Sequence, residues 1–257
     1  MKLRYLTLQI RPGIVSDSME KEFNQRVEYI CYFITIKMRR LRFETDANYR
    51  HIHIRVGSDK APSIVPDRTL EVGIPFSMEA YTNSKNCLPE YYVARILEGL
   101  TKAGITHQLP LLELKQIIQE FRSNGYQNNW LYFKRKIRQH GLSVEMTCSF
   151  TEDHYQMEGS FFSILDGTLL CKGIVARTKP DPFYFSSDVS KVIIKGDEIR
   201  ICDKLQHELI AIDLVKARTG EICRVLLPCP NPEMHLYRDV YLDDLYREMQ
   251  SDLSYGM

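Results

Sequence analysis

The sequence has no uninterrupted apolar run approaching the roughly 20 residues that a membrane-spanning helix needs. The longest candidate, Tyr29 to Met38, is interrupted by Thr35 and Lys37. The amino terminus, Met1 to Leu6, lacks the long apolar core and the small-residue cleavage site of a secretory signal. We therefore expect a protein that contacts no membrane.

Closely paired cysteines are also missing. The seven cysteines are odd in number and scattered, and no two form a C-x-x-C pair. This spacing fits reduced thiols better than a disulfide framework or a zinc ribbon. It predicts a cytoplasmic protein.

The common signatures of nucleotide binding and hydrolysis are absent. The chain contains neither a G-x-x-x-x-G-K-[ST] nor a G-x-G-x-x-G loop, no G-x-S-x-G elbow and no H-E-x-x-H pair. His51 and His53 form an H-x-H on one strand face, but no other histidine has a ligand-like spacing to them. We therefore predict no cofactor, no metal and no catalytic residue.

The composition is that of a folded protein with an uneven distribution of charge. Of the 257 residues, 44% are hydrophobic and 26% are charged, which suffices for a sizeable core. Residues 1–140 carry 22 Lys and Arg against 14 Asp and Glu, whereas residues 141–257 carry 12 against 19. A basic half suits phosphates, and an acidic half suits basic proteins.

The first seventy-odd residues are rich in strand signals. Lys2–Arg11 and His51–Val56 alternate in polarity, and Asp67–Ile74 is a further short segment. Val27–Phe43 is dense in Ile, Tyr, Phe and Thr, which predicts a long strand whose first turn could be helical. We expect these segments to form an antiparallel sheet.

Two helices are expected next. After Pro89, Val93, Ile96, Leu97 and Leu100 follow helical spacing, and Gly104 ends the pattern. A second helix begins at Pro110 and repeats this spacing through Leu114, Ile117, Ile118 and Phe121. The short link between them predicts a helical hairpin packed on the sheet.

After residue 142 the sequence again favours strands. Six strands are expected, near 143–150, 154–165, 168–176, 189–194, 199–203 and 208–214, with hairpin turns at Asp166-Gly167 and Gly196-Asp197. A last amphipathic helix is expected at about Asp239 to Leu253.

The predicted fold class is therefore α+β, without the βαβ rhythm of a dinucleotide-binding fold. An N-terminal antiparallel sheet carries a helical hairpin, and a C-terminal β-rich meander is closed by the amphipathic helix. The regions are a basic one over residues 1–140 and an acidic one over residues 141–257, as two domains or as one continuous domain.

Four sets of residues suggest functions. In the basic half, aromatic and cationic residues adjoin in a segment suited to stacking bases and neutralising phosphates, comprising Trp130, Lys134, Arg135, Lys136 and Arg138. A second basic cluster, Lys37, Arg39, Arg40 and Arg42, is expected to divide between two strand faces. The carboxylates and the lysine of metal-dependent nucleases are loosely matched by Asp67, Glu113 and Lys115. In those nucleases the Glu and Lys lie on a strand, whereas Glu113 and Lys115 lie in a predicted helix.

In the acidic half, tyrosine and phenylalanine anchors lie among carboxylates, as in a surface that binds a basic protein. The residues are Phe183, Tyr184, Tyr237, Tyr241, Asp243 and Asp244. The leading hypothesis is a non-catalytic protein-binding module, such as a stoichiometric inhibitor of the immunity or antitoxin type with a basic protein partner. The alternatives are a nucleic-acid-binding protein that uses the basic half and a divergent metal-dependent nuclease-like enzyme.

Overall fold

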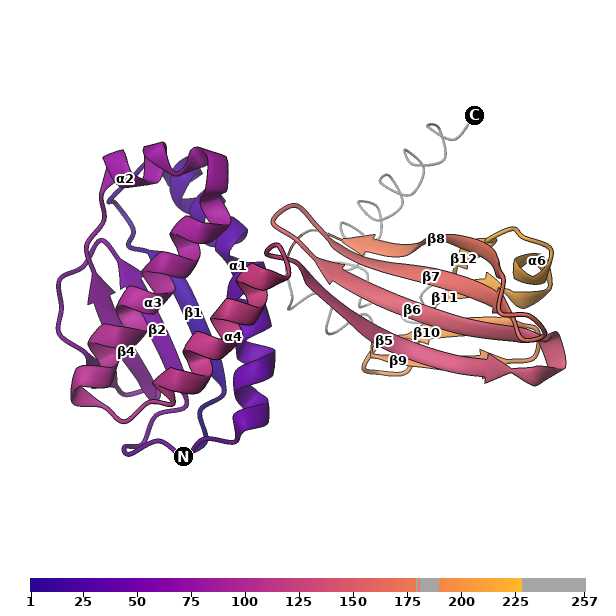
Figure 1. Cartoon of the computed structure of the whole chain (residues 1–257), viewed down its shortest axis with the longest axis horizontal. Coiled ribbons are helices and arrows are strands. Elements are labelled where there is room, and N and C mark those ends of the chain that lie inside the picture. The colour runs from indigo at the N-terminus through magenta and orange to yellow at the C-terminus, as the bar shows by residue number, and fades with distance from the viewer. Residues whose placement is uncertain (179, 181–189, 228–257) are drawn as a thin grey trace. The chain divides into compact units, whose positions relative to one another are not determined.

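The computed structural model describes residues 1–178, 180 and 190–227 (Figure 1). The chain divides into two compact units, Met1–Asn128 and Asn129–Met257, which are called unit 1 and unit 2 below. The boundary expected after residue 140 falls inside unit 2, and the division into two domains or one continuous domain stays a prediction. Both helices and sheets are present, so the chain belongs to the α+β class.

Unit 1 is built on a four-stranded mixed sheet in the order β1-β2-β4-β3. The strands are β1 (Tyr5–Ile10), β2 (His51–Val56), β3 (Ser63–Val65) and β4 (Thr69–Ile74). β1, β2 and β4 run parallel, and only the short β3 is antiparallel to its neighbour. The prediction of an antiparallel N-terminal sheet was therefore wrong.

The reason is the helix α1 (Asp17–Leu41), which occupies most of the segment predicted as the strand Val27–Phe43. A helix between β1 and β2 returns the chain to its starting edge, so the two strands must run parallel. This β1-α1-β2 arrangement is also the βαβ unit that the sequence was expected to lack. Ser16 accepts a hydrogen bond from the amide of Met19 at the amino end of the helix, and Arg42 ends it in the left-handed conformation.

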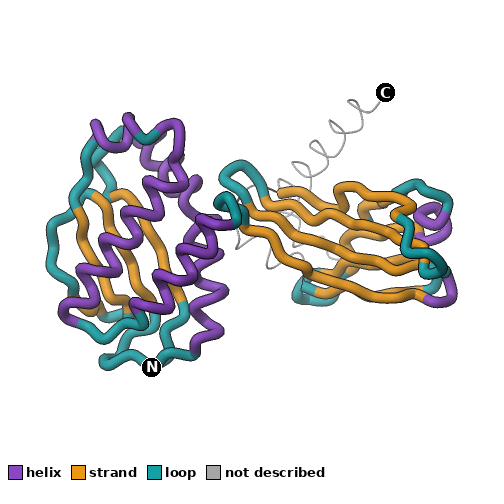
Figure 2. Tube along the Cα trace, in the orientation of Figure 1, coloured by secondary structure: helices purple, strands orange, loops and turns teal. Residues whose placement is uncertain are grey.

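The predicted helical hairpin is confirmed by α3 (Leu88–Thr106) and α4 (Leu111–Ser123). The short helices α2 (Met78–Asn83) and η1 (Lys85–Cys87) precede it. α3 packs on β2 and β4, whereas α1 packs on β1 and on both hairpin helices (Figure 2). Gly99 allows α3 to approach the sheet closely, because a Cβ there would lie 2.7 Å from side-chain carbons of Ile54.

In the described part of the chain, helices cover only one face of this sheet. Alternate residues of β1 and β2 are buried beneath the helices, among them Leu6, Leu8, Ile52 and Ile54. The intervening residues carry polar side chains that are half-buried or exposed, so unit 1 has two layers, with helices on one side of the sheet. We call the uncovered side the open face.

Unit 2 contains two four-stranded antiparallel sheets. The first, in the order β5-β6-β7-β8, comprises β5 (Asn128–Ile137), β6 (Leu142–Phe150), β7 (Tyr155–Ser163) and β8 (Leu169–Thr178). The second, in the order β12-β11-β10-β9, comprises β9 (Lys191–Lys195), β10 (Glu198–Cys202), β11 (Glu208–Asp213) and β12 (Arg224–Leu226). Figure 1 shows the two sheets layered, with the short helix α6 (Leu214–Arg218) at one end.

Each sheet of unit 2 follows chain order, as a meander does. Strands lie at all six predicted places, and Gly167 and Gly196 lie in the predicted turns with positive φ. The 3-10 turn η2 (Arg138–His140) joins β5 to β6. The helix expected at Asp239 to Leu253 lies outside the described residues. Among the residues that are described, no helix is both long and apolar enough to span a membrane.

Candidate nucleic-acid interface on the open sheet face

The open face carries polar and aromatic side chains in ordered rows. Because β1, β2 and β4 are parallel and in register, Tyr5 lies beside His51, and His51 beside Thr69. In the next row Thr7 lies beside His53, and His53 beside Glu71. Adjacent strands are about 4.8 Å apart, and successive rows on one face are about 6.7 Å apart.

A chain of hydrogen bonds joins the two histidines. The Oγ1 atom of Thr7 lies 2.7 Å from Nε2 of His51 and 2.8 Å from Nδ1 of His53. The Nδ1 atom of His51 lies 3.3 Å from Oγ1 of Thr69. Both ring nitrogens of His51 are therefore engaged, and the orientation of both rings is fixed.

Both imidazoles are held in the neutral form. Burial, with a further contribution from His53, lowers the pKa of His51 to about 4. Burial and the positive charge of Arg55 lower the pKa of His53. At neutral pH the pair presents flat, uncharged rings whose centroids are 5.9 Å apart.

Arg55 follows His53 by two residues and lies on the same face. Its guanidinium forms an ion pair with Glu71, with Nη2 at 3.4 Å from Oε2. Its Nε atom is buried and has no hydrogen-bond partner in the described part of the chain. An unsatisfied donor of a cation favours an anionic ligand.

Tyr5 supplies the most accessible ring of the open face, with 41% of the residue exposed. The guanidinium of Arg39 lies over this ring, 4.4 Å from its centroid, and Nε of Arg39 donates to the carbonyl oxygen of Arg4. Tyr5 also makes an edge contact with His51. A tyrosine fixed in this way offers a rigid surface on which a base can stack.

Three arginines line the edge of the sheet at which the parallel strands begin. Arg4, Arg50 and Arg68 immediately precede β1, β2 and β4. Their backbones are joined, since the amide of Arg4 donates to the carbonyl of Arg50 at 2.8 Å, and the amide of Arg50 donates to that of Arg68 at 3.0 Å. We call these three residues the arginine row.

The arginine row is exposed, and its charge is not neutralised by the described residues. Among them, the side chains of Arg4, Arg50 and Arg68 form no hydrogen bond and no ion pair. Lys2 and the end of α1 add further cations, and the segments 1–4, 39–50 and 67–68 together hold seven basic and three acidic residues. This edge is therefore a focus of positive potential.

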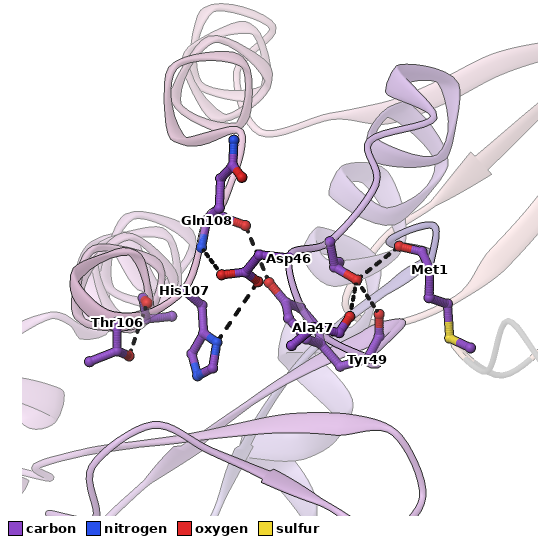
Figure 3. A network of polar contacts seen from close by, with 9 residues as sticks. Met1, Asp46, Ala47, Tyr49, Thr106, His107 and Gln108 are labelled. Carbon is purple, nitrogen blue, oxygen red and sulfur yellow. Dashed lines mark hydrogen bonds and ion pairs between the residues drawn. The ribbon is translucent and has the colours of Figure 1, made fainter.

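A network of polar contacts holds the loop that leads to Arg50 (Figure 3). One carboxylate oxygen of Asp46 accepts from the amide of Gln108 at 2.8 Å, and the other lies 3.9 Å from Nδ1 of His107. The hydroxyl of Tyr49 donates to the carbonyl of Gln108 at 3.3 Å. The loop is thereby tied to the connection between α3 and α4, and Asp46 is engaged away from the arginine row.

The basic segment predicted from the sequence lies elsewhere, in unit 2. Lys134, Arg135 and Lys136 are exposed on β5, and Arg138 is exposed in η2. Nζ of Lys134 lies 2.5 Å from Glu145, a half-exposed residue on the outer face of its sheet.

Trp130 belongs to the other side of that sheet. Its ring packs edge-on against Tyr155, with centroids 5.4 Å apart, and Tyr155 is buried on the inner face. The structure therefore does not bring Trp130 and Lys134 together on one face. That these residues bind nucleic acid stays a prediction.

The second predicted cluster was assigned to the wrong structure. Lys37, Arg39, Arg40 and Arg42 lie on the last turns of α1 and at its cap, not on a strand. Lys37 is paired with Glu120 at 2.6 Å and lies over the ring of Phe33, whereas Arg39 reaches Tyr5. The faces of this cluster follow from helical spacing, so the predicted division between strand faces does not apply.

The residues suggested for a metal-dependent nuclease come from separate elements. Asp67 lies in the turn between β3 and β4, and Glu113 and Lys115 lie in the first turns of α4. Within the described ranges, no group of three or more His, Cys, Asp or Glu side chains has the geometry to hold a metal ion.

The residues suggested for a protein interface lie outside the described residues. They are Phe183, Tyr184, Tyr237, Tyr241, Asp243 and Asp244. Binding of a basic protein partner therefore stays a prediction.

Sequence reasoning missed the arginine row and the roles of Thr7 and Glu71. A signal for the arginines was present, because Arg4 and Arg68 lie near the start of the predicted strand segments Lys2–Arg11 and Asp67–Ile74, and Arg50 directly precedes His51–Val56. The three come together only when those strands are aligned in parallel. The erroneous strand at Val27–Phe43 hid that alignment.

Comparison of the chain with family models, with curated proteins and with solved structures finds no match. Function must therefore be argued from the geometry of the open face and its arginine edge.

Proposed function

We propose that unit 1 binds single-stranded nucleic acid, with phosphates at the arginine row and bases against the open face. The observation that carries this proposal is the alignment of Arg4, Arg50 and Arg68 on neighbouring strands, exposed and without a carboxylate partner among the described residues. Arginine forks match phosphate oxygens in a bidentate manner, and each phosphate neutralised releases counterions.

The open face supports the choice of a single strand. Tyr5 and His51 present rings in the row that directly follows the arginine row, and His53 presents a ring in the next row. Rings can stack only on bases that are unpaired and turned outward, which a duplex does not provide. Sheet surfaces with aromatic side chains are a common way to bind single strands, because successive bases stack on the rings. A duplex is more often recognised by a helix that enters its major groove.

We expect little dependence on base sequence. Phosphate contacts set the position of a strand but do not distinguish bases, and every base has a face that can stack. Affinity should therefore depend strongly on salt and weakly on sequence.

The test is the affinity of the full chain for a labelled 12-nucleotide single strand, measured by fluorescence anisotropy over a range of salt concentrations. The triple variant Arg4→Ala, Arg50→Ala, Arg68→Ala should bind more weakly. The slope of log K against log salt should fall by about 2, since each phosphate contact contributes about 0.7 for a single strand.

The matched control is the quadruple variant Lys134→Ala, Arg135→Ala, Lys136→Ala, Arg138→Ala in unit 2. It removes more positive charge than the triple variant, so a general electrostatic effect would weaken its binding at least as much. We expect it to bind like the wild type. Circular dichroism verifies that both variants are folded.

Three results would count against the proposal. Absence of binding by the wild type at low salt would end it. Loss of binding in the quadruple variant but not in the triple variant would move the interface to β5. Equal affinity for a duplex of the same length would remove the single-strand assignment.

A further inference from the structure

Among the described residues, the histidine pair has one ring nitrogen that is not engaged, and it belongs to His53. The Nδ1 atom of His53 is bonded to Thr7, whereas both nitrogens of His51 are taken up by Thr7 and Thr69. Within the described part of the chain, Nε2 of His53 has no hydrogen-bond partner. A fixed imidazole with one open nitrogen has the geometry of a general base.

The hydrogen-bond chain can supply the tautomer that a base requires. When Nδ1–H of His53 donates to Thr7, the hydroxyl of Thr7 donates to Nε2 of His51, and Nδ1–H of His51 donates to Thr69. Every proton in this direction has an acceptor, and Nε2 of His53 is left with a free lone pair.

Two charged residues are neighbours of His53 on the open face. Glu71 is the register neighbour of His53, and Arg55 lies two residues further along β2 on the same face. Arg55 retains a buried Nε without a partner among the described residues, and the arginine row lies at the edge of the same sheet. Such cations can stabilise negative charge that develops on a phosphate.

We propose that the strand bound by the open face is RNA and that His53 is the general base for its cleavage by the ribose 2′-hydroxyl. This inference rests on the proposed function, because the arginine row must first hold the phosphate. The substrate class is single-stranded RNA, and DNA is bound but not cut.

The reaction is an internal phosphoryl transfer. Nε2 of His53 takes the proton from the 2′-hydroxyl, the O2′–P bond forms and the P–O5′ bond breaks. The 5′-oxygen receives a proton from the resulting imidazolium, directly or through a water molecule, so His53 returns to its neutral form. The products are a 2′,3′-cyclic phosphate and a free 5′-hydroxyl, and no oxidant, reductant or other co-reactant is required.

The experiment incubates the full chain with a 5′-labelled 12-nucleotide RNA in the presence of EDTA. Products are separated by electrophoresis, and their ends are identified by mass spectrometry. We expect cleavage to products that carry 2′,3′-cyclic phosphate. A second RNA with one 2′-deoxy residue should remain intact at that linkage alone.

The variant His53→Gln keeps a neutral side chain of similar length but removes the base. We expect its cleavage rate at saturating RNA to fall about 100-fold or more. Because His53 is also one of the rings of the open face, the affinity of this variant should fall by no more than the cost of one stacking ring, and saturation removes that effect from the rate. The control is His154→Gln, a half-buried histidine of unit 2 whose pKa is also lowered, and it should cleave like the wild type. Both proteins are purified identically, so a contaminating nuclease would cleave equally in both.

The outcomes separate this inference from the proposed function. RNA that is bound but not cleaved overturns the inference and leaves the proposed function intact. Absence of RNA and DNA binding overturns both. Cleavage that His53→Gln does not reduce, or cleavage at the 2′-deoxy linkage, overturns the role of His53.

Discussion

The hydroxyl of Thr7 and the imidazole of His53, 46 residues apart in the sequence, are joined across two strands by a 2.8 Å contact between Oγ1 and Nδ1. The same hydroxyl lies 2.7 Å from His51, so one threonine on β1 orients both histidines of β2. Thr7 is therefore a positioning residue for the open face.

The variant Thr7→Val keeps the shape of the side chain and removes its hydrogen bonds. We expect it to lower the free energy of unfolding by about 1 kcal/mol, because the half-buried ring nitrogens lose partners that water replaces only in part. Urea unfolding followed at 222 nm measures this change. Thr147→Val is the control, since Thr147 is exposed on β6, and it should stay within about 0.5 kcal/mol of the wild type. If Thr7→Val were as stable as the wild type, the hydrogen bonds of Thr7 to the two histidines would contribute nothing to the free energy of unfolding.

Stability of unit 1 should decrease as the pH falls from about 6.5 towards 4. The pKa of His51 is lowered to about 4 and that of His53 is also lowered, whereas an unfolded histidine titrates near 6.5. Between these values the unfolded chain binds more protons than the folded chain, so acid favours unfolding. Above pH 7 both states are neutral, and the pair contributes no pH dependence.

Urea unfolding at pH 7 and pH 5 tests this expectation. The helical signal at 222 nm suits the purpose, because the long helices of the described residues, α1, α3 and α4, all belong to unit 1. The double variant His51→Gln, His53→Gln should lose less stability between the two pH values than the wild type. His154 is present in both proteins, so its own titration cancels. If both proteins lost the same stability between pH 7 and pH 5, the pH dependence would not come from His51 and His53.

Tyr5 should contribute to binding by stacking. Replacing Tyr5 with Ala should reduce affinity for a single strand by about 1–3 kcal/mol, the range for loss of one base-stacking ring. Tyr5→Phe keeps the ring and should bind like the wild type. Leu131→Ala, at an exposed position of β5, is the control for loss of apolar surface. If Tyr5→Phe and Tyr5→Ala bind equally weakly, the hydroxyl and not the ring makes the contact.

The largest error of sequence reasoning concerned α1. The buried residues of this helix include Phe23, Val27, Ile30, Ile34 and Met38, whose spacing follows helical periodicity. The prediction followed the β-branched and aromatic composition instead, although propensity is the weaker signal. These buried residues pack on β1, α3 and α4, and this packing stabilises the helix although the local composition favours a strand.

Unit 2 was predictable because its signals are local. The turns at Gly167 and Gly196 need positive φ, which glycine adopts readily, and the flanking segments alternate in burial. The open face was not predictable in this way. Tyr5, His51 and Thr69 become neighbours only through long-range parallel pairing, which no sequence spacing encodes.

A close contact beneath the open face provides the last prediction. Ile54 lies between His53 and Arg55 on β2, and its side chain points to the helices, where it meets Gly99 of α3. In Gly99→Ala, the new methyl group would lie 2.7 Å from Cγ2 and Cδ1 of Ile54. Overpacking of this kind typically costs about 1–3 kcal/mol, so Gly99→Ala should be destabilised by that amount despite the better helix propensity of alanine.

A double-mutant cycle shows whether this contact is the cause. Ile54→Ala alone should cost about 2–5 kcal/mol because it leaves a cavity, but it also removes the atoms that the new methyl group would strike. The double variant should therefore be less destabilised than the sum of the two single variants, by about 1 kcal/mol or more. Gly125→Ala is the matched control: Gly125 has φ of +63°, and a methyl group there would meet no described atom within 4 Å, so its cost is one of backbone strain. The destabilisation caused by Gly125→Ala should therefore simply add to that caused by Ile54→Ala. Strict additivity for Gly99→Ala as well would show that α3 moves away from the sheet, and that the helix layer does not hold β2 and its histidines in place.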